Sequence, residues 1–302
     1  LANTAEPLFI VNRSGNRPSH EGVVPKFDAA IDLCRRAGFK DILLRGDTDF
    51  ALTFAFDNWD ERGVRFIFGN DARKNMVEQA DQMPEKLYRE LERRAERVIA
   101  TRPREKPEDV KDRIVRERGF RTLRPNGEDV VEFDYQPGKC KKVYRVVALR
   151  KNITVTKGDI ALFDEIRYFF YITNDRTLTA DAVVHEARQR CNQENLIEQL
   201  KNGVHALHAP VNTLNANGAY MLMASLAWTL KAWFALSLPV SPRWKERHSA
   251  EREDVLRMEF RTFIASLINI PAQIIRAGRR LIFRLLSWNL SEQMLFRFLD
   301  AI

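Results

Sequence analysis

Hydrophobic and polar positions in the first part of the chain follow patterns that predict an α/β fold. Residues 42–44 form a short, continuous apolar run, which is typical of a strand buried on both faces. A second run of this kind covers residues 64–68, and a helix around residues 51–59 is expected between them. Residues 27–37 have helical spacing, and Gly38 follows where a helix-ending glycine is expected. Strand, helix and strand at this pitch indicate α/β architecture.

A β-hairpin is predicted further along the chain. Acidic and apolar residues alternate over residues 130–135, the sequence Gln-Pro-Gly-Lys at residues 136–139 favours a turn, and an apolar strand is predicted over residues 143–149. A two-residue turn in this segment would set Asp134 opposite Lys141. We therefore expect cross-strand pairing to neutralise part of the charge of the hairpin.

The second half of the chain is expected to be mainly helical. One more apolar strand covers residues 168–173. A long helix is predicted from residue 180 to residue 202, with Gly203 at its end. Further helices are predicted over residues 217–238 and from residue 251 onward.

Composition narrows the class of protein. With 45% hydrophobic residues, 19 Phe and 5 Trp, the 302-residue chain can bury a large core, which excludes global disorder. Three widely spaced cysteines exclude a disulfide scaffold and fit a reducing cytosol. The net charge of +8 favours a polyanionic partner. Residues 86–124, which begin with a helical stripe, carry 14 basic and eight acidic side chains, and residues 139–157 carry seven basic side chains and no acidic one.

The segment from Ala219 to Val240 is long and apolar enough to cross a bilayer. Lys231 lies near its middle and strongly charged residues follow it, so we interpret the segment as a buried helix and expect no membrane partner. A membrane-associated helical protein is the alternative. The chain begins at Leu1 without a signal-peptide pattern, so we expect an N-terminally truncated cytoplasmic protein.

Asp47 is the first candidate for chemistry. It follows the strand predicted at residues 42–44, and open α/β sheets bind ligands at the carboxyl ends of their strands. A carboxylate at such a place is costly to bury unless it is paired or bound to a metal ion. The alternative is that Asp47 caps the helix that begins near Ala51, a role for which Asp49 is better placed.

The helix predicted at residues 180–202 carries the second candidate. Arg190, Glu194 and Lys201 lie at positions i, i+4 and i+11, which puts them on one face of a regular helix. An ordinary row of solvent-facing ion pairs would show the same spacing.

The spacing of these residues resembles the signature helix of insertion-sequence DDE transposases, in which Tyr, Arg, Glu and Lys are separated by two, three and six residues. Arg190, Glu194 and Lys201 match this pattern, and Ala187 stands at the tyrosine position. Three other segments resemble parts of the same family in the same order: residues 12–16, 44–50 and 171–174.

The resemblance implies an α/β protein with a ribonuclease H-like core, interrupted by a mostly β insertion domain and followed by an α-helical C-terminal region. The expected segments are the first part of the core at residues 1–72, a basic insertion domain of helix plus hairpin at residues 73–165, the second part of the core with the Glu helix at residues 166–240, and the C-terminal region at residues 241–302.

The resemblance also implies DNA cleavage at transposon ends and strand transfer into target DNA. Asp47 and Glu194 would bind two Mg²⁺ or Mn²⁺ ions, and Arg190 and Lys201 would contact phosphate. The family's first catalytic aspartate lies upstream of the segment that residues 7–12 resemble, so we expect it outside this chain. The alternative function is therefore a catalytically inactive remnant that binds only DNA or a partner subunit.

Six basic residues around the hairpin are candidates for contact with double-stranded DNA: Lys139, Lys141, Lys142, Arg145, Arg150 and Lys151. Cross-strand ion pairs are the alternative role for these residues. A second basic cluster, expected on a helix, fits a solvated face as well as a DNA or subunit contact: Arg276, Arg279, Arg280 and Arg284. A homodimer in a synaptic complex and a location in the bacterial cytoplasm, at the nucleoid when bound, follow from the resemblance alone.

Overall fold

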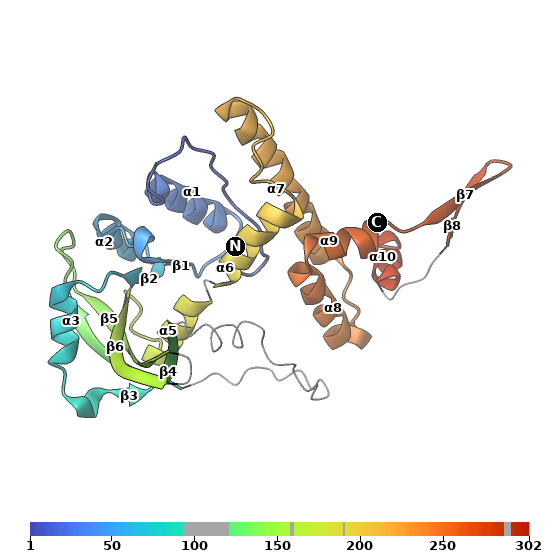
Figure 1. The fold of residues 1–302 in the computed structure, drawn as a ribbon. Coiled ribbons are helices and arrows are strands. Elements are labelled where there is room, and N and C mark those ends of the chain that lie inside the picture. Colours follow the sequence, from blue (N-terminus) through green and yellow to red (C-terminus); the bar gives the residue numbers. More distant parts are fainter. Residues whose placement is uncertain (93–120, 158–159, 190, 287–290, 302) are drawn as a thin grey trace. The chain divides into compact units, whose positions relative to one another are not determined.

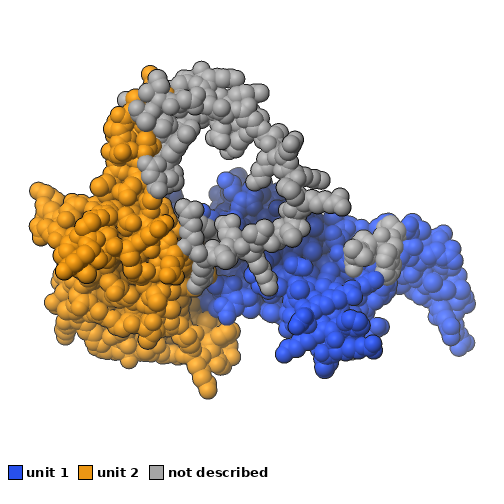
Figure 2. Space-filling model, turned by 90° about the horizontal axis from the view of Figure 1, so that it is seen from below, with its two compact units in different colours: residues 1–17, 191–302 blue, residues 18–190 orange. Residues whose placement is uncertain are grey.

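The computed structural model describes residues 1–92, 121–157, 160–189, 191–286 and 291–301 of the chain. The chain divides into two compact units. Unit 1 contains Leu1–Arg17 and Cys191–Ile302, and unit 2 contains Pro18–Arg190 (Figure 2). Each unit has hydrophobic clusters of its own.

Unit 2 is built on a six-stranded mixed sheet with the strand order β1-β2-β6-β5-β4-β3 (Figure 1). The strands are β1 (Leu43–Gly46), β2 (Arg65–Asn70), β3 (Arg89–Glu90), β4 (Arg121–Tyr135), β5 (Tyr144–Lys157) and β6 (Ile160–Thr173). β1 and β2 are parallel, whereas β6, β5, β4 and β3 continue the sheet in antiparallel pairs. The predicted α/β class is confirmed by this sheet and the helices around it.

Helices pack on both faces of the sheet. One face is covered by α1 (Val23–Arg36), α2 (Phe56–Glu61) and α3 (Lys74–Asp81), and the other by α5 (Ala180–Arg188). The alternation of side chains along β2 explains this arrangement, because Phe66 and Phe68 pack with Phe56 and Trp59 on the first face while Ile67 joins the cluster of α5. All five side chains are fully buried, so β2 lies at the centre of the hydrophobic core of unit 2.

Short turns replace two of the predicted helices. Between β1 and α2 lie the 3₁₀ turns η1 (Thr48–Phe50) and η2 (Thr53–Ala55), so the helix expected from residue 51 begins only at Phe56. The helix expected from residue 86 is wrong for its first residues, because the 3₁₀ turn η3 (Glu85–Leu87) is followed by β3. Residues 93–120, the rest of that prediction, lie outside the described residues.

The predicted hairpin is present but longer, and its register differs. β4 and β5 are joined by the connection 136–143 rather than by a two-residue turn. Asp134 therefore pairs in register with Arg145, and the prediction that it faces Lys141 is wrong. The sheet also continues across the boundary expected at residues 165 and 166, because β6 runs through both residues and pairs with β5 and β2.

Unit 1 is mainly helical. Its elements are α6 (Cys191–Glu198), the π-helical turn η4 (Gln199–Gly203), α7 (Leu214–Ser237), the 3₁₀ turn η5 (Pro242–Trp244), α8 (Lys245–Arg257), α9 (Phe260–Phe263), the π-helical turn η6 (Ile264–Ile268), β7 (Ala272–Ala277), β8 (Arg280–Leu285) and α10 (Glu292–Leu299). Thr213 caps α7 by accepting a hydrogen bond from the amide of Ala216. The end of α7 packs against α8, α9 and η6 through Ala235, Val255 and Phe263.

The C-terminal region is not wholly helical, contrary to the prediction. β7 and β8 form a separate two-stranded hairpin that turns at Gly278, whose φ of 60° suits glycine (Figure 1). The cluster of four arginines expected on a helix lies on this hairpin. β-branched isoleucines on both strands favour this conformation over a helix.

α7 is buried on only one side. Trp228, Lys231 and Ala235 are buried, but Leu222 and Trp233 have exposed fractions of 62% and 50%. Among the described residues, this is the one helix long and apolar enough to cross a membrane, and 28% of its most apolar window is buried. The prediction of a buried helix is therefore correct for one face and wrong for the other.

Candidate functional site

Asp47 lies immediately after β1, at the carboxyl end of the parallel pair β1–β2. Its backbone is extended, and its Oδ1 accepts a hydrogen bond of 3.1 Å from the amide of Asp49. Asp47 is therefore the N-cap of η1, as the capping alternative predicted, although the element is a 3₁₀ turn and not a helix beginning near Ala51. The side chain is half-buried. A cap and a metal ligand are compatible roles, because this hydrogen bond fixes the direction of the carboxylate.

Glycine brings the end of β2 close to Asp47. A Cβ atom on Gly69 would lie 3.1 Å from the amide nitrogen of Thr48 and 3.4 Å from the carbonyl carbon of Asp47. A Cβ atom on Gly46 would lie 2.8 Å from the Cβ atom of Phe50. The backbone that carries Asp47 thus lies against the end of β2 at a separation that only glycine permits without a shift.

Arg45 joins β1 to the end of α5. Its guanidinium donates hydrogen bonds of 3.2 Å to the carbonyl oxygen of Glu186, 3.2 Å to the Glu186 carboxylate and 3.0 Å to Oε1 of Gln189. Alternation along the strand puts Asp47 on the same face of the sheet as Arg45. The chain that continues toward Glu194 therefore leaves unit 2 beside the strand that carries Asp47, a contact that the sequence did not reveal.

A buried carboxylate fixes the connection from β6 to α5. The side chain of Asp175 accepts hydrogen bonds from the Arg65 guanidinium at 2.7 Å and from the amides of Thr177 and Leu178 at 2.7 and 3.0 Å. Burial alone would raise the pKa of Asp175, but these hydrogen bonds outweigh it and lower the pKa to about 2. Asp175 is thus a structural anchor for the start of α5.

Glu194 and Lys201 belong to unit 1, whereas Asp47 belongs to unit 2. Glu194 is exposed on α6, and Lys201 is exposed on the π-helical turn η4. The regular helix predicted over residues 180–202 is wrong at this end, because a π turn advances the chain by a smaller angle per residue. Lys201 therefore departs from the face expected from regular spacing, and Arg190 lies outside the described residues.

Comparison with protein families identifies the family of the chain. A family model described as transposase DDE domain group 1 matches residues 2–302, which is nearly the whole sequence. The chain belongs to the DDE transposases. No curated protein matches this transposase chain. Members of the family are transposition enzymes that act on DNA and generally use divalent metal ions.

The six basic residues predicted to contact DNA fall into two groups in this transposase. Lys142, Arg145, Arg150 and Lys151 form ion pairs with carboxylates of unit 2: Asp60, Glu132, Glu85 with Asp129, and Glu128, respectively. Lys139 and Lys141 have no ion pair with any described residue. The cross-strand alternative therefore holds for Arg145, Arg150 and Lys151, which pair with carboxylates of β4, whereas Lys142 pairs with Asp60 of α2. Two cations, Lys139 and Lys141, are left available to a partner.

Arg150 is the most strongly held of the paired cations. It lies over the ring of Tyr88, 3.8 Å from the centroid, and hydrogen bonds from its guanidinium to Glu85 and Asp129 raise its pKa. The signal in the sequence for these pairs is weak, because Glu85 lies 65 positions away from Arg150.

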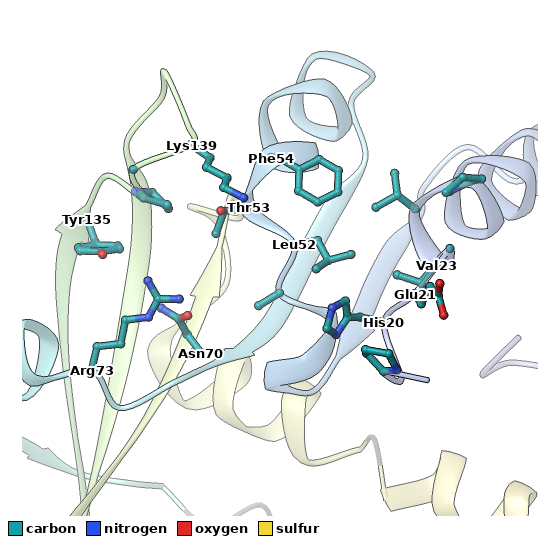
Figure 3. Close-up of a pocket in the computed structure, with 17 residues that line it drawn as sticks. His20, Glu21, Val23, Leu52, Thr53, Phe54, Asn70, Arg73, Tyr135 and Lys139 are labelled. Atoms are coloured by element: carbon teal, nitrogen blue, oxygen red, sulfur yellow. The ribbon is translucent and has the colours of Figure 1, made fainter. Parts of the chain in front are cut away.

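A pocket of about 970 Å³ opens on unit 2, on the side where the connections after β1 and β2 lie (Figure 3). It is lined by the chain before and at the start of α1, by residues 51–54 after η1, by Asn70 at the end of β2 with Arg73 beyond it, and by the end of β4 with the connection to β5. Sequence reasoning missed Phe54 and Arg73 as site residues, since no motif surrounds them.

The donors at the candidate metal site are of the type that Mg²⁺ and Mn²⁺ prefer, because Asp47 and Glu194 supply only carboxylate oxygens. Within the residues that the structure describes, no group of three or more His, Cys, Asp or Glu side chains is arranged to hold a metal ion. The carboxylates of Asp47 and Glu194 are therefore of a chemical type that suits the divalent metals generally used by the family.

Proposed function

We propose that this DDE transposase cleaves DNA at transposon ends in a metal-dependent reaction and transfers the freed strand into target DNA. In this proposal Asp47 and Glu194 hold the metal ions, and Arg190 and Lys201 contact the phosphates of the bound strand. The supporting core is ribonuclease H-like, with its carboxylates at the end of a parallel strand and on a following helix.

The contact of Arg45 with Glu186 and Gln189 carries this proposal. It holds the last turn of α5 beside β1, two residues before Asp47 and eight residues before Glu194. The segment that leads on to Glu194, 147 positions after Asp47 in the sequence, therefore begins beside β1. The proposed metal site takes one carboxylate from the strand end and one from the helix that follows α5.

A pair of divalent ions would activate the attacking oxygen and stabilise the leaving oxygen of the phosphodiester. Asp47 would bind such an ion from a backbone held by η1, Gly46 and Gly69. Glu194 would approach on α6 as the second carboxylate, and the family pattern adds a third. A protein that lacks the third group would retain only binding to DNA or to a partner subunit, which is the alternative function.

Double-stranded DNA is the proposed partner, with Lys139 and Lys141 as its contacts on unit 2. A homodimer in a synaptic complex, in the bacterial cytoplasm and at the nucleoid when bound, completes the proposal. Attraction between unpaired lysines and phosphates predicts that binding weakens as salt concentration rises.

The test uses the complete gene product and a DNA fragment that carries the element's own end. Asp47→Asn and Glu194→Gln should each abolish cleavage in Mg²⁺ and leave DNA binding in EDTA unchanged. Asp49→Asn is the matched control, because this carboxylate is exposed and the residue contacts Asp47 through its backbone amide. Full cleavage by either variant would refute the assignment, and binding without cleavage by the wild-type protein would favour the alternative function.

A further inference from the structure

The pocket on unit 2 combines four walls that come from distant parts of the sequence (Figure 3). Residues 18–25 and 51–54 line one side, and residues 70–73 and 135–139 contribute Asn70, Arg73, Tyr135 and Lys139. Its volume of about 970 Å³ lies within the range of small-molecule sites and is sufficient for a nucleotide.

The pocket contains two cations that no carboxylate of the described residues neutralises. Arg73 and Lys139 both line it, and neither forms an ion pair with any residue in the described part of the chain. Glu21 is the single carboxylate among the residues that line it. The cations of the neighbouring β4–β5 region, by contrast, are matched with carboxylates. The pocket is therefore a place where an anion is attracted and no internal group competes for it.

The aromatic ring of Phe54 is exposed in the same pocket. Phe54 has an exposed fraction of 57%, although Phe56, two residues later, is fully buried. The ammonium of Lys139 lies 5.8 Å from the centroid of the Phe54 ring, and Tyr135 lines the opposite wall. An exposed ring beside a cation provides a stacking surface next to a phosphate-binding group, which is the combination found in sites for single-stranded nucleic acid.

We infer that this pocket binds one unpaired nucleotide of a DNA strand, with its base against Phe54 and its phosphate at Arg73 and Lys139. The inference deepens the proposed function, since it assumes that DNA is the substrate. A base within a duplex is stacked on both faces and does not expose one to Phe54, so the occupant is a single-stranded or extrahelical nucleotide. A neutral apolar ligand would leave both cations unsatisfied.

The pocket is linked to the candidate active site by one short connection. The segment that begins with Asp47 continues through η1 to Phe54. Asn70 follows Gly69 at the end of β2, where the backbone lies close to Asp47, and Arg73 lies three residues further on. A nucleotide bound in the pocket would therefore hold the DNA strand next to the phosphate that is cleaved at Asp47. Its role is to position that strand, and Phe54 and Arg73 are positioning residues in this scheme.

The experiment compares two labelled DNAs that differ only in one end, a blunt duplex and the same duplex with a short single-stranded overhang. Binding to the full chain is measured by fluorescence anisotropy in EDTA, so that no cleavage takes place. Phe54→Ala and Arg73→Gln should each weaken binding of the overhang DNA by about tenfold. Both should leave binding of the blunt duplex unchanged, and Phe54→Trp should restore the overhang affinity.

Matched controls are available on the same unit. Phe39 is another exposed phenylalanine, with 40% of its surface accessible, and Lys141 is an unpaired lysine two positions after Lys139. Phe39→Ala should leave both DNAs bound as in the wild type, and Lys141→Gln should weaken both equally. Thermal unfolding of each variant confirms that the fold is retained, which is expected since Phe54 and Arg73 are on the surface.

Three results would overturn the inference. Unchanged overhang binding by Phe54→Ala and Arg73→Gln would exclude the pocket as a nucleotide site. Equal weakening of both DNAs would make it an ordinary backbone contact. Competition by a free deoxynucleoside monophosphate, without any preference for the overhang, would assign it to a soluble nucleotide. Because these measurements involve no metal ion, they are independent of whether Asp47 and Glu194 support cleavage.

Discussion

Lys231 is a buried cation whose charge costs stability, and its replacement offers a quantitative test of the structure of unit 1. The side chain is 1% exposed, its Nζ donates a hydrogen bond of 2.9 Å to the carbonyl oxygen of Leu256, and it lies 4.0 Å from the ring centroid of Trp228. Burial lowers the pKa of Lys231 from its ordinary value of 10.5 to about 8. This difference corresponds to roughly 3 kcal/mol between the charged and neutral forms.

The sign of the pH dependence follows from the two pKa values. Between about pH 8 and pH 10.5 the unfolded chain holds a proton on Lys231 that the folded chain has released. The free energy of unfolding therefore rises with pH over this window, by roughly 3 kcal/mol in total. Below pH 8 the folded protein carries the whole cost of the buried ammonium.

Lys231→Met keeps the length of the side chain and removes the titrating group. The free energy of unfolding of the wild type minus that of the variant should rise by roughly 3 kcal/mol from pH 7.5 to pH 10.5, because the titration of all other groups cancels in this difference. Urea unfolding followed by tryptophan fluorescence measures it, and Lys245→Met, at an exposed lysine of α8, is the control. The lost hydrogen bond to Leu256 shifts the variant equally at every pH. Parallel pH profiles would refute the burial argument.

Three further predictions concern unit 2. Asp175→Asn should lower the free energy of unfolding by roughly 2 kcal/mol above pH 4, because the pKa of Asp175 in the folded protein, about 2, lies below its ordinary value of 3.8. The difference from wild type should vanish as the pH falls through 2, and a constant difference at all pH values would contradict this. Gly69→Ala should destabilise the protein by about 1–3 kcal/mol in thermal unfolding and reduce cleavage, because the added Cβ atom would press on the backbone of Thr48. Gly15→Ala is the control and should change neither, because a Cβ atom there would meet nothing within 4 Å. Cys140 should react slowly with iodoacetamide at pH 8 in the native protein, because burial raises the pKa of its thiol to about 11. Mass spectrometry measures the rate of modification, and equal rates in native and urea-unfolded protein would count against its burial.

The sequence predicted best those elements whose pattern is local. The apolar runs at residues 42–44 and 64–68 predict β1 and β2, because short continuous apolar runs are typical of buried strands, although β1 itself is buried only at Leu44. Asp47 is predicted from the same signal, as the first carboxylate after such a run. The β7–β8 hairpin is not predicted, although isoleucines on either side of Gly278 are a hairpin signal, because the spacing of its four arginines also fits one face of a helix.

Contacts between distant segments were not predictable from spacing. The pairing of Arg45 with Glu186 and of Lys142 with Asp60 depends on which elements pack together, and these partners are 141 and 82 positions apart. The π turn after α6 is similarly set by packing, since Leu200 joins the cluster of Trp228 and Ala206. One such turn changes which residues share a face, so the motif spacing around Glu194 remains informative about family and not about geometry.

The β7–β8 hairpin has a consequence for how the protein behaves in concentrated solution. Each of its strands pairs only with the other in the described structure, so two rows of backbone amides and carbonyls are open to a further strand. Ile274 and Phe283 lie across from each other and are 63% and 65% exposed, which adds an apolar surface to these open edges. Such edges promote strand-by-strand self-association, and the four arginines of the hairpin act against it by mutual repulsion. Screening of this repulsion at high salt should therefore make the purified chain precipitate before it unfolds.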